Sequence, residues 1–396
     1  MRVLLFTGKG GVGKSTVAAG TAALAAARGL RTLVLSTDAA HSLADTYDVE
    51  IGHQPTQIAP CLFAQQVDAQ RRFEASWAEI QNYLLSVLEV AGVDPVAAEE
   101  LTVLPGAEEV LALLELRQQV RTGDWDLVVV DCAPTAETLR LLAMPEALGW
   151  YMRRVFPTER RVVKALKPVL TRAAGVPMPE DSVFDAIERL HAELDEVRSL
   201  LSGPGASVRL VLTPERVVLA EARRSWTTLC LFGYTVDGVV ANRVFPDDAG
   251  DSWRHSWVRA QSEVMAEVVD SFDPLPLWRS EYQAHEPRGL DELAQLAHDL
   301  YGDADPFADS GAEPAFRITR TAGGAALSLN LPHTSSAQVD LARRGDDLII
   351  TVGPYRRSLT LPSALGRLRV AGARVEGGRL QVNFSEENSA DEGVRS

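Results

Sequence analysis

The chain has 396 residues, more than the roughly 250–300 at which a single hydrophobic core usually divides, so we expect more than one structural unit. Hydrophobic residues make up 46% of the sequence and charged residues 23%, a composition that excludes a wholly disordered chain. Acidic residues outnumber basic ones by 54 to 39, and the net charge of −15 argues against nucleic acid as a partner.

Three cysteines, Cys61, Cys132 and Cys230, are spread along the chain, and no two have the spacing of a zinc-binding pair. We therefore expect no zinc site. We also expect a reducing compartment, because secreted domains tend to carry dense disulfide frameworks and this chain has few cysteines. The apolar run at residues 3–6 is too short for a signal peptide, and no window reaches the roughly 20 apolar residues of a spanning helix. These features predict a soluble, cytoplasmic protein.

Short apolar runs typical of buried strands alternate with helical patterns over most of the chain. The runs are residues 3–6, 32–35, 127–130, 208–212 and 236–240. Such alternation predicts an α/β fold with a doubly wound, mostly parallel sheet. Two insertions, at about residues 68–120 and 146–203, carry apolar residues at helical spacing. We expect these insertions to form a helical subdomain.

A glycine-rich motif, GKGGVGKST, follows the first apolar run and opens a helical pattern. This strand–loop–helix context is that of a phosphate-binding loop, whose backbone N–H groups face an anion. Lys14 is expected to contact the β- and γ-phosphates, and the hydroxyl of Ser15 to bind Mg²⁺. The predicted binding residues are Gly8, Lys9, Gly10, Gly11, Val12, Gly13, Lys14, Ser15 and Thr16. A merely flexible turn would not need the Lys-Ser pair.

Lys9 is a second cation inside this loop, beside the phosphates that Lys14 already serves. Its side chain is predicted to point toward a second nucleotide across a homodimer interface, which would give Lys9 a catalytic role beside Lys14. An ordinary solvent-exposed lysine is the alternative interpretation.

Several segments in order resemble the ATPases of arsenite pumps and of tail-anchored-protein targeting. The longer segments are residues 9–16, 36–45 and 131–140. Shorter ones are residues 103–106, 213–215, 241–243 and 287–290. The resemblance covers roughly residues 1–300 and implies a P-loop ATPase with a deviant Walker A motif that works as a homodimer or as two fused copies.

The resemblance also implies roles for two acidic residues. Asp38, in the first switch segment, is expected to position and polarise the attacking water, because hydrolysis needs a residue that orients the nucleophile. Capping of the following helix is the alternative for Asp38. Asp131 ends an apolar strand, where a Walker B aspartate holds Mg²⁺ through a water molecule.

Glu215 and Asn242 match the positions that hold the nucleoside in these ATPases. Arg243 and Val244 follow Asn242, so the Asn-Lys-x-Asp pattern that reads guanine is missing. We therefore expect ATP as the nucleotide and Mg²⁺ as its cofactor.

The switch segments depart from the family pattern at three positions. Ala39 replaces the usual proline, and Ala136 and Glu137 replace the usual Gly-His pair. The Cys-x-x-Cys pair that forms a zinc clasp in some relatives is also missing. These changes concern the coupling of the switches and leave the phosphate chemistry intact.

Two functions fit the resemblance. A carrier of tail-anchored proteins builds a groove for a hydrophobic segment from helices of both subunits, and the helical insertions are in the right places for one. An arsenite-pump motor is the alternative, but it needs clustered thiolates, and three scattered cysteines are poor candidates. The sequence thus predicts ATP hydrolysis that drives binding and release of a hydrophobic protein client, with a nucleotide-gated chaperone as a further option.

A basic segment with near-helical periodicity lies in the second insertion. Its cations are Arg153, Arg154, Arg160, Arg161, Lys164, Lys167 and Arg172. Such a segment can make a transient contact with a membrane or a receptor; a solvated helix face is the alternative.

The pattern changes after the predicted ATPase domain, residues 1–301. Residues 302–315 are rich in Gly, Asp, Ala and Pro and are predicted to be a linker. Residues 316–385 show short alternating apolar runs, which predict a small antiparallel β-sandwich. Within them, residues 329–332, 346–352, 356–362 and 377–380 resemble the α-crystallin domain of small heat-shock proteins, which implies protein contacts; a passive stabilising appendage is the alternative. Residues 386–396 are polar and acidic, and we expect them to be disordered.

Overall fold

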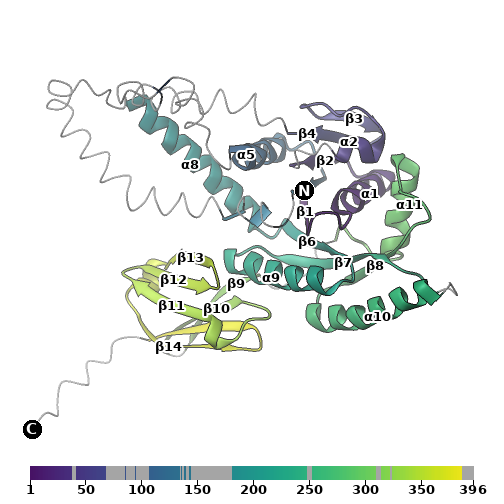
Figure 1. The fold of residues 1–396 in the computed structure, drawn as a ribbon. Helices are drawn as coiled ribbons and strands as arrows, with labels where there is room; N and C mark the ends of the chain where they lie inside the picture. The colour runs from purple at the N-terminus through teal and green to yellow at the C-terminus, as the bar shows by residue number, and fades with distance from the viewer. Residues whose placement is uncertain are drawn as a thin grey trace, which may run out of the picture. The chain divides into compact units, whose positions relative to one another are not determined.

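In the computed structural model, the described residues are 1–37, 42–67, 85, 94, 107–133, 135, 138–139, 142–143, 181–247, 252–308, 314–321 and 323–385. The chain divides into two units by its internal contacts. Unit 1 comprises Met1–Thr7, Lys14–Ala206 and Glu286–Gly302, and unit 2 comprises Gly8–Gly13, Ser207–His285 and Asp303–Ser396. Figure 1 labels the helices and strands.

The strands of unit 1 lie in the order β3-β4-β2-β5-β1. Their bounds are β1 (Arg2–Thr7), β2 (Thr32–Ser36), β3 (Thr56–Ala59), β4 (Leu62–Gln66) and β5 (Leu127–Asp131). All pairs are parallel except β3 with β4. Every residue of β2 and β5 is buried, as expected for strands covered on both faces. The prediction of a mostly parallel sheet is confirmed.

Helices of unit 1 accompany these strands. They are α1 (Lys14–Ala27), α2 (Ser42–Tyr47), α5 (Ala107–Thr122), α8 (Asp181–Leu201) and α11 (Gly289–Tyr301). Half of the residues of helix α1 are alanine, and the helix packs closely on α11: a Cβ at Gly20 would lie 2.7 Å from the carbonyl oxygen of Leu293. The predicted apolar stripe of α8 is confirmed, because Leu194 and Val197 are buried. The helical pattern predicted near residue 80 and the basic segment 153–172 lie outside the described residues.

Unit 2 contains three parallel strands and two long helices. They are β6 (Ala206–Leu212), α9 (Arg216–Phe232), β7 (Val236–Val244), α10 (Ser252–Phe272) and β8 (Leu277–Glu281). The strands lie in the order β6-β7-β8. A buried ion pair fastens the first two, because Arg209 Nη2 lies 3.0 Å from Asp237 Oδ2.

The C-terminal part of unit 2 is an all-β domain of two antiparallel sheets. Its elements are β9 (Phe316–Thr321), β10 (Gly324–Asn330), η1 (Ser336–Gln338), β11 (Val339–Arg344), β12 (Asp347–Val352), β13 (Tyr355–Thr360), α12 (Ser363–Gly366), β14 (Arg369–Glu376) and β15 (Arg379–Ser385). One sheet has the order β14-β15-β10-β9 and the other β11-β12-β13. Leu327, Ile350 and Val382 lie in the core between them. The predicted β-sandwich is confirmed.

Helix α9 packs against this β domain. Leu231 joins the hydrophobic core of the domain, and the ring of Phe232 meets that of Tyr355 edge-on at 6.4 Å between centroids. Arg357, on β13, is buried and donates a 2.6 Å hydrogen bond from Nη1 to the carbonyl oxygen of Leu231. The β domain is therefore seated on α9 through both apolar and polar contacts. Within the described ranges, no helix is long and apolar enough to cross a bilayer.

Candidate functional site

The glycine-rich turn Gly8–Gly13 is packed tightly within unit 2. A Cβ at Gly8 would lie 2.1 Å from the carbonyl oxygen of Val211, at the end of β6. Gly13 has a φ of +89°, and a Cβ there would lie 2.3 Å from Nδ2 of Asn242. Side chains are excluded at both positions by backbone and amide groups that cannot move away easily. Gly8 and Gly13 therefore fix the path of the loop.

Two side chains at the end of β7 hold the loop. The buried Asn242 donates a 2.8 Å hydrogen bond from Nδ2 to the carbonyl oxygen of Val12. Arg243 donates one of 2.9 Å from Nη1 to the carbonyl oxygen of Gly11. These bonds occupy two carbonyl oxygens that would otherwise repel an anion, and they add a cation beside the loop. Asn242, predicted from sequence to hold a nucleoside, thus first serves to shape the loop.

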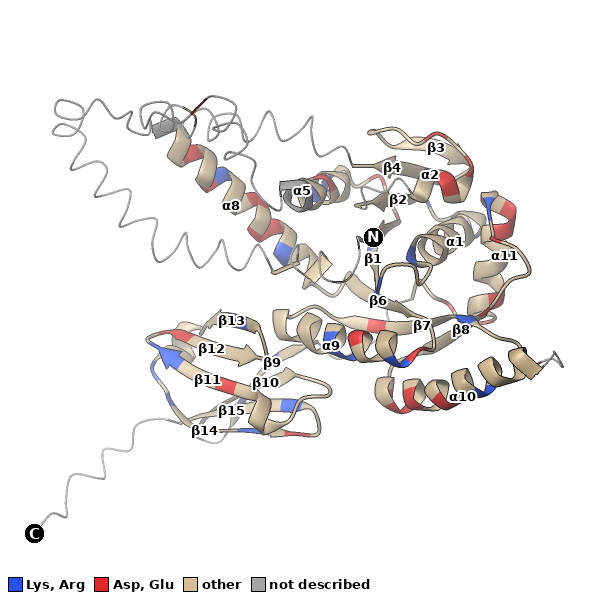
Figure 2. Cartoon of the chain, in the orientation of Figure 1, with Lys and Arg blue, Asp and Glu red and all other residues tan. Residues whose placement is uncertain are grey.

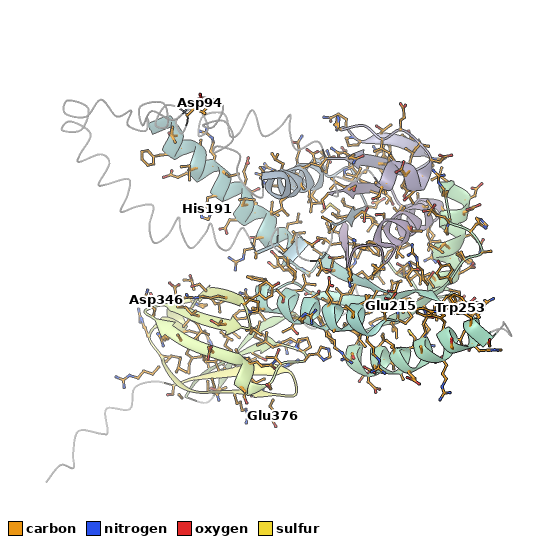
Figure 3. All side chains as sticks on the ribbon, viewed as in Figure 1. Asp94, His191, Glu215, Trp253, Asp346 and Glu376 are labelled. Carbon is orange, nitrogen blue, oxygen red and sulfur yellow. The ribbon has the colours of Figure 1, made fainter. Side chains whose placement is uncertain are left out.

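An open cavity of about 380 Å³ lies beside the loop in unit 2. That volume is in the range of small-molecule sites, roughly 300–1,000 Å³. Lys9 and Arg243 line it together with the predicted nucleoside residue Glu215. Glu215 is the residue before α9, and its Oε1 accepts a 3.2 Å hydrogen bond from Thr213 Oγ1. Figure 3 labels Glu215 and Trp253, which both line this cavity. The structure brings five of the predicted site residues to one cavity: Lys9, Gly10, Gly11, Val12 and Glu215.

Sequence reasoning missed an aromatic cluster on the wall of this cavity. Phe245 and Tyr282 stack with 5.3 Å between ring centroids. Trp257 lies 6.4 Å from Phe245 and 6.1 Å from Trp253. Trp253 is 63% exposed, an unusual state for so large an apolar side chain. The four-residue spacing of the two tryptophans in the first half of α10 was the available signal.

The predicted phosphate and magnesium residues Lys14 and Asp131 lie in unit 1. Lys14 is the first residue of α1 and is only 6% exposed, and Asp131 is fully buried at the C-terminal end of β5. Both residues act on the adjacent thiol of Cys132. Burial is the main cause that raises the pKa of this thiol, Asp131 raises it further, and Lys14 lowers it. Ligands of open α/β sheets bind beyond the carboxyl ends of the strands, so Asp131 is placed to face a bound ligand. The backbone carbonyl of Asp131 also accepts a 3.0 Å hydrogen bond from the N–H of Thr37.

Two hydroxyl groups meet near the start of α1. The Oγ of Ser15 and the Oγ of Ser42 are 2.9 Å apart and share a hydrogen bond. Ser42, the first residue of α2, was not predicted as a site residue. Hydroxyl and carboxylate oxygens are the ligands that Mg²⁺ prefers, so Ser15, Ser42 and Asp131 fit this ion. Among the described residues, no group of three or more His, Cys, Asp and Glu could hold a metal ion.

Four predicted switch positions lie outside the described residues. They are Asp38, the proposed water-positioning residue, with Ala39 beside it, and the pair Ala136 and Glu137. Thr16, the last residue of the motif, follows Ser15 in the first turn of α1 and is half-buried. The predicted roles of Thr16 and of the switch positions stay predictions.

Comparison with known proteins agrees with this arrangement. The model of the anion-transporting ATPase family, ArsA, matches residues 1–302, and that of an HSP20-like domain found in ArsA matches residues 322–384. The chain belongs to the ArsA ATPase family. The resemblance seen in the sequence is therefore confirmed, and the protein is an ATP-hydrolysing enzyme.

Relatives of this ArsA-family ATPase match along nearly the whole chain. A putative arsenical pump-driving ATPase of Aquifex aeolicus is 32% identical and covers 97% of this chain and 100% of its own length. A putative arsenical pump-driving ATPase of Chlorobaculum tepidum is 34% identical, and the match covers 98% of this chain and 96% of that relative. An uncharacterised protein of Streptomyces coelicolor is 39% identical, with 97% of both chains covered. The β domain is thus part of a shared architecture.

Proposed function

We propose that this ATPase acts as an Mg²⁺-dependent homodimer whose cycle of ATP hydrolysis binds and releases a hydrophobic protein segment. One observation carries the nucleotide part of the proposal: Asn242 and Arg243 hold the carbonyl oxygens of Val12 and Gly11. A loop held in this way needs little rearrangement to accept phosphates, and preorganised donors are the main source of electrostatic stabilisation in phosphoryl transfer.

The residues of the motif divide the chemistry among them. Lys14, at the start of α1, would take the charge of the β- and γ-phosphates. Ser15 and Ser42, with Asp131 through water, would hold Mg²⁺, which when bound neutralises charge that develops on the phosphate oxygens. Asp38 would orient the water that attacks.

Helix α9 supports a coupling between the nucleotide site and the HSP20-like domain. Its first turn lines the cavity beside the loop, through Val218 and the preceding Glu215. Its last turns carry Trp226 and Phe232, which pack against rings of the β domain. A helix of 17 residues transmits a shift of one end to the other because its backbone is hydrogen-bonded throughout. A nucleotide-dependent shift at Glu215 would therefore reach the HSP20-like domain.

The motor of an arsenite efflux pump is the second candidate, favoured by the names of two relatives. Arsenite is a soft, thiol-seeking ligand that needs accessible thiolates close together. Cys132 and Cys230 are buried, and burial raises the pKa of both thiols, that of Cys230 to about 12. Cys61 is the partly exposed cysteine. These thiols suit a soft metalloid poorly, so we rank the pump motor second.

Steady-state ATP hydrolysis tests both the site and the choice between the two functions. We would compare the wild type with Lys14→Ala and Asp38→Asn, and use Arg28→Ala, an exposed change just beyond α1, as the control. We expect Lys14→Ala to lose nucleotide binding and Asp38→Asn to bind ATP but lose turnover. Wild-type turnover in Asp38→Asn would remove that residue from its proposed role.

The same assay is repeated with arsenite and, separately, with a peptide of a transmembrane segment. We expect stimulation by the peptide, which should also co-purify with the protein. Stimulation by arsenite alone would make the protein a pump motor and overturn the client proposal. Sedimentation analysis with and without ATP tests the homodimer, and a monomer under both conditions would contradict it.

A further inference from the structure

The C-terminal β domain has a charge opposite to that of the whole chain. Residues 316–385 contain ten arginines, no lysine and four acidic residues, whereas the full sequence has a net charge of −15. Figure 2 shows the basic positions of this domain in blue on several of its strands. Arginine presents a planar fork of donors that matches carboxylate and phosphate groups, so an all-arginine set indicates recognition of oxyanions more than general solubility.

Strand register collects four of these arginines on one face. Residues of β10 and β15 alternate between the buried core and the outside, with Leu380, Val382 and Phe384 inward. The outward positions of the four-stranded sheet hold Arg317 on β9, Arg369 and Arg374 on β14, and Arg379 on β15. Glu376 is the acidic residue among the outward strand positions. We call this surface the arginine face.

The arginine face is partly built in advance. Arg374 donates from Nε and Nη2 to Oε1 of Gln381, at 3.1 and 2.9 Å. A small cavity of about 10 Å³ lies between Arg317 and Arg379, and Ser328 and Asn330 also line it. That space is about the size of a single oxygen atom or water. Two guanidinium groups with a hydroxyl and an amide around such a cavity suit one carboxylate oxygen.

We propose that the arginine face binds a carboxylate-rich polypeptide segment of another protein, with one carboxylate seated between Arg317 and Arg379. Charge complementarity supports this partner, since the face carries four arginines and one acidic residue. Among its outward strand positions there is no aromatic residue on which bases could stack, which disfavours single-stranded nucleic acid. The inference does not depend on the proposed client cycle.

Fluorescence anisotropy of a labelled oligoglutamate peptide, titrated with the full chain, tests the proposal. One variant combines Arg317→Gln, Arg374→Gln and Arg379→Gln. The control combines Arg320→Gln, Arg344→Gln and Arg356→Gln, which removes the same charge from exposed positions of the same domain that lie off the face. Thermal unfolding verifies that both variants fold. We expect salt-sensitive binding that the first variant weakens about tenfold or more and the control changes less than about twofold.

Three results would overturn the proposal. Equal losses in the two variants would mean that only net charge matters. Binding of a labelled oligothymidine at least as tight as that of the peptide would make the face a nucleic-acid surface. Binding of the peptide only after removal of residues 386–396, which contain four acidic residues and one arginine, would assign the face to the chain's own tail.

Discussion

The amide of Asn242 lies 2.8 Å from the carbonyl oxygen of Val12 and fixes the phosphate loop from the end of β7. These residues are 230 positions apart in the sequence, so the loop depends on correct folding of both segments. The next residue, Gly13, leaves no room for a Cβ against the same amide. The loop and the Asn242 side chain therefore form one packed unit, and each constrains the other.

Asn242→Asp should weaken nucleotide binding by about tenfold or more, since a carboxylate would face the carbonyl oxygen of Val12 and oppose the phosphates. We also expect the free energy of unfolding to fall by about 1–3 kcal/mol, the usual cost of an unsatisfied buried acceptor. Titration with a fluorescent ATP analogue and urea denaturation measure the two effects. Asn383→Asp, an exposed change on β15, is the matched control. Wild-type affinity in Asn242→Asp would show that the loop is held by other contacts.

Two glycines of the loop should respond differently to the same added methyl group. Gly8→Ala drives a Cβ to 2.1 Å from the carbonyl oxygen of Val211, whereas a Cβ at Gly10 meets nothing within 4 Å. We expect Gly8→Ala to lower the free energy of unfolding by roughly 1–3 kcal/mol and Gly10→Ala to change it by less than about 0.5 kcal/mol. Urea denaturation measures both. Equal stability of the two variants would contradict the packing described for Gly8.

The sequence pattern was sufficient for the loop and for the five strands β1, β2, β5, β6 and β7, because these depend on local signals. Runs such as residues 127–130 are continuously apolar, and the loop needs glycines followed by Lys14 and Ser15. Strands β3, β4 and β8 were missed because polar residues such as Gln57, Gln65 and Arg279 interrupt their apolar runs, and β3 and β8 are edge strands. Edge strands of this kind gain their stability from one neighbouring strand and leave a weaker pattern.

Other features depend on residues distant in the sequence and have no local signature. In the sequence, Ser42 is a typical residue for the start of a helix. Its hydrogen bond to Ser15 is visible only in the folded structure. Arg357 belongs to an Arg-Arg pair that looks solvent-exposed, yet one member is buried against α9. The sequence thus predicts roles in phosphate chemistry for Lys14 and Ser15, which stay predictions, and it gives no sign of the long-range contacts that hold the loop and the β domain in place.

Arg357→Met should loosen the β domain from α9. The change removes the hydrogen bond to the carbonyl oxygen of Leu231 and leaves that buried acceptor unsatisfied, at a cost of about 1–3 kcal/mol. The control is Arg356→Met, because Arg356 is the exposed neighbour on the same strand. Limited proteolysis and urea denaturation measure the effect, and we expect faster cleavage near residues 302–315 in Arg357→Met alone. Identical behaviour of the two variants would show that the buried arginine adds nothing to the contact.

The three cysteines should differ sharply in their reaction with iodoacetamide. The thiolate is the reactive form, and burial raises the pKa of Cys132 and Cys230, so at pH 8 both remain protonated as well as shielded. We expect labelling of the native protein at the partly exposed Cys61 and labelling of all three only in denaturant. Mass spectrometry of peptides from the labelled protein measures each site, with Cys61→Ala as the control that should leave the native protein unlabelled. Fast native labelling of Cys132 would contradict its burial. It would also supply a second reactive thiol in unit 1 and strengthen the arsenite alternative.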